Sequence, residues 1–123
     1  MARVLIVDDT DIVRKALELA VRKMGHDAES TSDAKVALEL ARLHLPDLAL
    51  LDYRMPGMDG ATLLGEMRKE LGSRCPKVLF VSATPPDEVR AKAESAGARP
   101  VGYVKKPFHL DDLSKLVAEA LAA

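Results

Sequence analysis

The sequence VLIVDD at residues 4–9 decides the fold class, because four aliphatic residues run directly into two acids. A second segment has the same form, since LALL at residues 48–51 is followed by Asp52. Short aliphatic runs bounded by polar residues are typical of strands that are buried on both faces of a parallel sheet. Open α/β sheets bind ligands beyond the carboxyl ends of their strands, so Asp8, Asp9 and Asp52 are candidate site residues.

The three acids would be costly to bring together without a counter-charge. If the two strands are neighbours, three carboxylates converge within a short distance and repel each other. A divalent cation or a shared proton relieves this repulsion, and a hard metal ion is the simplest solution. The sequence therefore predicts a metal site at the carboxyl edge of the sheet.

Strand-like and helix-like segments alternate five times along the chain. The expected strands are residues 4–7, 27–31, 48–51, 78–81 and 102–104. Each is followed by apolar residues at helical spacing, in the segments 12–24, 34–41, 64–71, 89–96 and 110–121. This alternation implies an α/β fold with a parallel sheet and helices on both faces. A length of 123 residues predicts a single domain over residues 1–123.

Composition argues against several classes of protein. The net charge of -1 gives no electrostatic attraction to nucleic acid or to anionic membranes. The single cysteine, Cys75, rules out an intrachain disulfide and fits a reducing compartment. No apolar run is long enough for a signal peptide or for the roughly 18 residues of a membrane helix. We therefore expect a cytoplasmic protein with no direct nucleic-acid binding and no membrane insertion.

The fourth and fifth expected strands also end in functional groups. Ser82 follows one of them, and Lys105, Lys106 and Pro107 follow the other. Each of these residues alone has an ordinary explanation, such as helix capping or a solvated surface. Three acids, a hydroxyl and an ammonium at one edge of a sheet are together typical of a phosphoryl-transfer site.

Four motifs resemble those of the receiver domain of bacterial two-component response regulators, across essentially the whole chain. They are Asp8-Asp9, LLDYRMPGMDG at residues 50–60, VSA at 81–83 and GYVKKPF at 102–108. The resemblance implies a flavodoxin-like, doubly wound sheet of five parallel strands in the order 2-1-3-4-5, with five helices. The neighbouring positions of the first and third strands come from this resemblance and not from the hydrophobic pattern.

The resemblance also implies roles for the acids. Asp52 would accept a phosphoryl group from the phosphohistidine of a histidine kinase or a histidine phosphotransfer protein. Asp9, Asp52 and the backbone carbonyl of Arg54 would bind Mg²⁺, or Mn²⁺ in its place, and Asp8 would act mainly through a bound water. The domain would gain and lose its own phosphoryl group without turning over an external substrate. In this sense it would not be an enzyme.

Further roles follow from the same resemblance. Lys106 and Ser82 would contact phosphoryl oxygens, and Lys105 would face solvent. Ser82 and Tyr103 would form a switch that reshapes the surface of the fourth helix, fifth strand and fifth helix for an unknown output protein. The Lys106-Pro107 bond is a candidate cis peptide. We expect a monomer or a phosphorylation-dependent dimer.

Two alternatives come from other classes. DTDIV at residues 9–13 fits the DxDxV signature of haloacid-dehalogenase-like phosphatases, with Asp9 as nucleophile. That reading has no room for a cap domain and leaves residues 50–60 unexplained. It also requires a late acid pair at a strand end, whereas Asp111-Asp112 open a helix. A non-phosphorylated pseudo-receiver that acts as a docking module is the other alternative, although every acid that the chemistry needs is present.

The chain departs from the family pattern between its fourth helix and fifth strand. Arg99-Pro100-Val101 lengthens this connection by about two residues. Because the sequence ends with the fifth helix, we expect either a free-standing regulator or part of a longer protein. The histidines lie outside any ligand-like cluster and are expected at the surface or in loops, at positions 26, 44 and 109.

Overall fold

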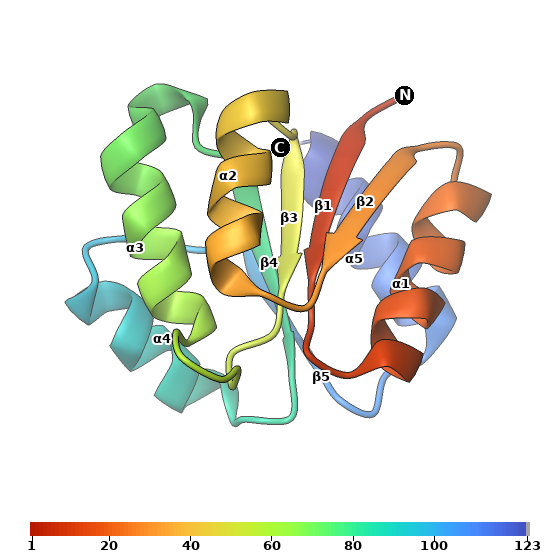
Figure 1. The fold of residues 1–123 in the computed structure, drawn as a ribbon. Coiled ribbons are helices and arrows are strands. Elements are labelled where there is room, and N and C mark those ends of the chain that lie inside the picture. Colours follow the sequence, from red (N-terminus) through yellow and green to blue (C-terminus); the bar gives the residue numbers. More distant parts are fainter. Residues whose placement is uncertain (123) are drawn as a thin grey trace.

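The structure is a computed structural model that describes residues 1–122 as alternating strands and helices (Figure 1). The strands are β1 (Arg3–Val7), β2 (Asp27–Thr31), β3 (Leu48–Leu51), β4 (Lys77–Ser82) and β5 (Gly102–Lys105). The helices are α1 (Asp11–Lys23), α2 (Ala34–His44), α3 (Gly60–Leu71), α4 (Pro86–Ser95) and α5 (Leu110–Ala122), with a short 3₁₀ turn η1 (Gly72–Arg74) after α3. All strand pairs are parallel, and their order is β2-β1-β3-β4-β5, which confirms the predicted fold.

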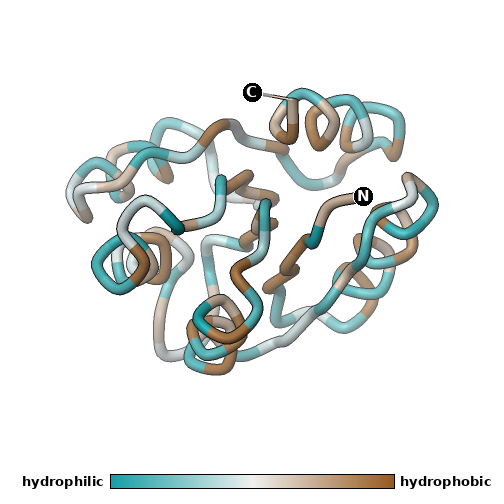
Figure 2. The backbone as a smooth tube through the Cα atoms, turned by 90° about the horizontal axis from the view of Figure 1, so that it is seen from above, coloured by the Kyte–Doolittle hydropathy of each residue, from teal (hydrophilic) through white to brown (hydrophobic). Residues whose placement is uncertain are grey.

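The sheet is covered on both faces, with α1 and α5 on one side and α2, α3 and α4 on the other (Figure 1). Successive residues of β1 therefore enter different cores. Val4 and Ile6 pack toward α1 and α5, whereas Leu5 and Val7 pack toward the other three helices. Figure 2 shows the apolar segments of the strands at the centre, surrounded by helices that have hydrophilic outer faces. Burial on both faces explains why the strands read as unbroken aliphatic runs.

Aspartates cap two of the helices that surround the site. The Asp33 carboxylate accepts hydrogen bonds from the backbone at the start of α2, and Asp59 accepts one from Thr62 N at 2.7 Å at the start of α3. Thr10 is the N-cap residue of α1, but its side chain makes no capping hydrogen bond. The turn before α1 is held instead by Asp8 Oδ1, which accepts from Thr10 N at 2.9 Å.

Three helix positions differ from the predicted apolar faces. Ile12 is 82% exposed and Leu110 is 57% exposed, although both fit the helical repeat of their segments. Each lies in the first turn of its helix, at the carboxyl edge of the sheet, where the helix has little sheet to cover. The fourth helix ends at Ser95, so Ala96 is its exposed C-cap residue and not part of its buried face.

The structure also bears on two smaller expectations. The bond between Lys106 and Pro107 is cis, as the resemblance implied. Among residues 1–122, no helix is both long and apolar enough to cross a membrane.

Candidate functional site

The register of the central strands brings two of the predicted acids together. Val7 of β1 is paired with Leu51 of β3, so the next residues, Asp8 and Asp52, leave the sheet side by side. The pairing continues for one more step, because Asp52 N donates to the Val7 carbonyl at 2.9 Å. The parallel strands therefore deliver both carboxylates to the same edge of the sheet, as expected for this class of fold.

Asp9 completes a cluster of three acids. Asp8, Asp9 and Asp52 each offer a carboxylate oxygen, and these oxygens lie within 4.8 Å of one another. Asp8 is fully buried, Asp52 is 7% exposed, and Asp9 is open to solvent. Several carboxylate oxygens with one open side fit a hard divalent cation that retains part of its water shell. The residues present therefore suit the predicted Mg²⁺ site.

Lys106 supplies the positive charge of the site. Ser82 of β4 is paired with Lys105 of β5, and Lys106 N donates to the Ser82 carbonyl at 2.9 Å. This pairing turns Lys106 toward the acids, where Nζ donates to Asp8 Oδ2 at 2.7 Å and to Asp52 Oδ2 at 3.2 Å. Lys105 is exposed, as predicted.

The electrostatics of the site favour an added cation. Burial raises the pKa of the Asp52 carboxyl, and the charge of Asp8 raises it further, while Lys106 and the Ser82 hydroxyl lower it only in part. Burial lowers the pKa of Lys106, but its bond to Asp8 and the charges of both acids outweigh burial, so this pKa is raised. Lys106 is therefore protonated at neutral pH. One ammonium faces three acids, and the excess negative charge is what a divalent cation offsets.

Gly60 allows helix α3 to begin against the backbone of Asp52. A Cβ at this position would lie 2.3 Å from the Asp52 carbonyl oxygen and 3.0 Å from the Phe80 ring. Gly60 N also donates to the Tyr53 carbonyl at 2.7 Å, which closes the loop after β3. The loop geometry around Asp52 therefore depends on the absence of a side chain at residue 60.

The two residues that we predicted to form a switch, Ser82 and Tyr103, lie on the neighbouring strands β4 and β5. Ser82 is 4% exposed, and its Oγ accepts a hydrogen bond from Thr84 N at 3.2 Å. The Tyr103 ring is half-buried and stacks on Phe80 with 6.0 Å between the ring centroids. The Arg90 guanidinium lies 5.3 Å from the centre of the Tyr103 ring. Tyr103 thus lies on the face formed by α4, β5 and α5.

The Arg54 side chain has two partners, and one of them, Glu88, was not predicted from the sequence. Its Nε donates to Thr84 Oγ1 at 3.2 Å, and its Nη2 lies 3.5 Å from Glu88 Oε2. Glu88 is an exposed acid in the first turn of a helix, where acids are common because they suit the helix dipole. In the sequence, nothing distinguishes Glu88 from the neighbouring acid Asp87.

The positions of the acids outside this cluster argue against the interpretation as a phosphatase. Asp11 is the second acid of the DxDxV signature, which would be the general acid of such a phosphatase, and its side chain is 77% exposed and paired with Arg14. Asp111 and Asp112 lie in the first turn of α5, as predicted, and not at a strand end. The acids that a dehalogenase-like phosphatase would use are therefore not assembled at one point.

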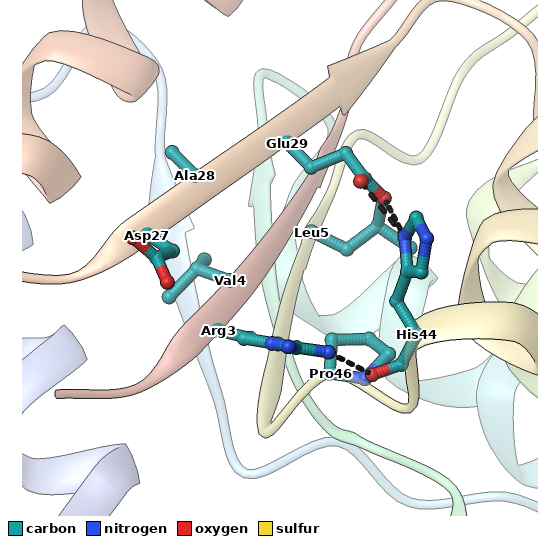
Figure 3. Close-up of a pocket in the computed structure, with 8 residues that line it drawn as sticks. All are labelled: Arg3, Val4, Leu5, Asp27, Ala28, Glu29, His44 and Pro46. Atoms are coloured by element: carbon teal, nitrogen blue, oxygen red, sulfur yellow. Dashed lines mark hydrogen bonds and ion pairs between the residues drawn. The ribbon is translucent and has the colours of Figure 1, made fainter.

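A depression of about 270 Å³ lies at the opposite, amino-terminal edge of the sheet (Figure 3). In it the His44 Nδ1 atom lies 2.9 Å from the Glu29 carboxylate, and Arg3 donates to the His44 carbonyl at 3.2 Å. These contacts join the end of α2 to β1 and β2. None of the predicted site residues lines this depression, and its contacts are structural.

Comparison with known families finds a match to the response regulator receiver domain over residues 4–118. Among curated proteins, regulatory protein AtoC of Escherichia coli K12 is 40% identical over 120 residues, which are 97% of this chain and 25% of AtoC. Virulence transcriptional regulatory protein PhoP of Salmonella choleraesuis is 34% identical over 113 residues, which are 92% of this chain and 49% of PhoP. The chain thus spans a quarter to about half of the length of these relatives.

Solved structures show the same architecture. A putative response regulator from Chloroflexus aurantiacus superposes with a TM-score of 0.87 at 31% identity, and covers 99% of this chain and 98% of its own. Chemotaxis protein CheY4 of Vibrio cholerae has a TM-score of 0.88 at 26% identity, with 98% of both chains covered.

Proposed function

Because the chain belongs to the response regulator receiver domain family, we propose that residues 1–123 form one phosphoryl-accepting signalling domain with Asp52 as the acceptor. The observation that carries this proposal is the cluster at the sheet edge. The nearly buried carboxylate of Asp52 lies among Asp8 and Asp9, with the Lys106 ammonium 3.2 Å away. Asp52 is the buried acid of this cluster that follows β3 directly, which suits an acceptor at a strand end.

The proposed reaction is an in-line transfer from a phosphohistidine of a histidine kinase or histidine phosphotransfer protein. An Asp52 carboxylate oxygen attacks phosphorus, the P–N bond to the donor imidazole breaks, and the donor recovers its histidine. Lys106 and Ser82 stabilise the negative phosphoryl oxygens by charge-assisted hydrogen bonds. Water later cleaves the acyl phosphate, so the domain resets itself without an external substrate.

Asp9, Asp52 and the backbone carbonyl of Arg54 would hold Mg²⁺, with Asp8 acting through a bound water. The ion would supply positive charge that offsets the repulsion between the acids and the incoming phosphoryl group. The raised pKa of Asp52 supports this role, because burial and the charge of Asp8 act against the ionised carboxylate, which is the nucleophile, and a bound cation would act in its favour.

The output step uses the Ser82 hydroxyl and the Tyr103 ring. A phosphoryl group at Asp52 draws Ser82 toward it and leaves space behind, which the half-buried Tyr103 ring enters. This movement biases the surface of α4, β5 and α5 toward a form that binds an output partner or a second copy of the domain. The relatives AtoC and PhoP carry names of regulatory proteins, which supports a regulatory output.

Mass spectrometry after incubation with acetyl phosphate and Mg²⁺ tests the acceptor. We expect the mass of one added phosphoryl group in the wild type and none in Asp52→Asn. Asp27→Asn is a suitable control, because Asp27 is exposed at the opposite edge of the sheet. Sustained turnover of a phosphate ester that is lost in Asp9→Asn but survives in Asp52→Asn would instead favour the phosphatase.

A further inference from the structure

One side chain joins the acceptor loop to helix α4. Arg54 follows β3 by three positions, and its guanidinium contacts Thr84, which comes just after β4, at 3.2 Å. The same guanidinium lies 3.5 Å from the carboxylate of Glu88 in the first turn of α4. Arg54 therefore spans from the loop that carries Asp52 to the start of a helix on the output face.

Helix α4 buries few side chains. Only Val89 and Ala93 are buried among its ten residues, and Pro85 provides no side-chain cap at its N-terminus. The remaining side-chain contacts described for α4 include the Arg54–Glu88 pair on one side and Arg90 against the Tyr103 ring on the other. A helix with so little buried apolar surface is an element whose position weak polar contacts can bias.

Arg54 also borders the acidic cluster. Together with Asp9 it lines an open depression of about 420 Å³. The Arg54 side chain is 74% exposed, so no packing prevents it from turning between Glu88 and this depression. A phosphoryl group adds roughly two negative charges, and the planar guanidinium fits its oxygens with paired hydrogen bonds.

We propose that Arg54 is a charge-sensitive latch on helix α4. In the unmodified domain, the guanidinium holds Glu88 and Thr84 and so restrains the start of the helix. When Asp52 is phosphorylated, the guanidinium turns to the phosphoryl oxygens, and Glu88 and the first turn of α4 are released. The latch rests on the proposed function, and it makes Arg54 a positioning residue that acts through Glu88 on the output face.

The expected size of the effect follows from exposure. An ion pair between exposed side chains in water shifts an equilibrium by at most about five-fold. A dianionic phosphoryl group on Asp52, which is more buried than Glu88, competes for the Arg54 guanidinium through stronger, charge-assisted hydrogen bonds. Release of the latch therefore changes the opening of α4 by about two- to five-fold, which biases a pre-existing equilibrium without unfolding the domain.

Amide hydrogen exchange in α4 tests the latch, with beryllofluoride and Mg²⁺ as the phosphoryl analogue. The informative variant is Glu88→Gln, and its matched control is Asp87→Asn. Both remove one acid from the first turn of α4, but Asp87 contacts Arg90 and not Arg54. Fluorine NMR on the same samples reports whether the analogue is bound.

In the wild type, we expect bound analogue to raise exchange in α4 about two- to five-fold. Glu88→Gln should show this raised exchange without the analogue and respond little to its addition, whereas Asp87→Asn should behave as the wild type. An undiminished response in Glu88→Gln, or an equal loss in Asp87→Asn, would overturn the latch. Absence of bound analogue in the wild type would overturn the proposed function and the latch together.

Discussion

At the scale of single residues, the site depends on a glycine at position 60, because glycine has no Cβ atom. Gly60 lets α3 begin against the Asp52 backbone, because a Cβ there would lie 2.3 Å from the Asp52 carbonyl oxygen. This neighbour is backbone and cannot rotate away, so a side chain would displace the acceptor loop itself.

We therefore expect Gly60→Ala to destabilise the domain by about 2 kcal/mol and to slow phosphorylation by acetyl phosphate. Urea unfolding measures the first effect and mass spectrometry the second. Gly65→Ala is the control in the same helix, since its Cβ would lie 3.1 Å from the Ala96 Cβ and 3.2 Å from the Ala96 carbonyl oxygen, contacts that need a much smaller shift than the 2.3 Å contact at Gly60. Equal losses in both variants would mean that the contact with Asp52 is not the cause.

Asp52 itself should make stability depend on pH. Its folded pKa is raised by burial and by the charge of Asp8, so the fold favours the protonated form. The metal-free wild type therefore loses stability as pH rises from the ordinary value of 3.8 through the raised value, and Asp52→Asn does not share this loss. Above this window, Asp52→Asn should be more stable than the wild type, on the order of 1 kcal/mol.

Urea titrations with a chelator, at a series of pH values, measure this difference. It should be near zero below pH 3.8 and grow as pH rises. Asp27→Asn, which removes an exposed acid, should show no such growth. A difference that is constant with pH would contradict the argument.

At the scale of elements, the proposed output step depends on the contacts between β4 and β5. Ser82 is the last residue of β4 and is paired with Lys105 of β5, and the Tyr103 ring of β5 stacks on Phe80 of β4. Ser82→Ala should still accept a phosphoryl group at Asp52 but lose most of the phosphorylation-dependent gain in partner affinity, because no hydroxyl moves toward the phosphoryl oxygens.

Tyr103→Ala should behave in the same way, since no ring fills the space behind Ser82. Binding titrations with and without phosphorylation measure the ratio of affinities for each variant. Tyr53→Phe is a control that alters the other tyrosine, which is buried beside Asp52. A wild-type ratio in Ser82→Ala and Tyr103→Ala would leave both residues as packing residues only.

The sequence predicted the type and order of the elements because burial on both faces leaves unbroken aliphatic runs. It could not place β1 beside β3 without the family resemblance, since strand order depends on how helices cross the sheet. Helical periodicity placed Ile12 on a buried face, but periodicity does not say where the sheet ends beneath a helix. The contact between Glu88 and Arg54 was missed because the two residues lie 34 positions apart and come together only in the fold.

At the scale of the whole molecule, Asp8 and Asp52 link the two central strands to the proposed metal site. Asp8 continues β1 and Asp52 continues β3, and both strands have residues in the two cores. A cation that binds these acids only in the folded state stabilises the entire domain, by about 2.7 kcal/mol at a hundred times its dissociation constant.

Asp9→Asn should remove most of this Mg²⁺-dependent stabilisation, because the Asp9 carboxylate is one of few charged ligands for the ion. The metal-free stability should stay nearly unchanged, because Asp9 is exposed. Thermal unfolding across a series of Mg²⁺ concentrations measures both quantities. Asp11→Asn is the matched control, since Asp11 is a nearby exposed acid that pairs with Arg14 outside the cluster. The control should keep the full Mg²⁺ response, and an unchanged response in Asp9→Asn would mean that the ion binds elsewhere on the domain.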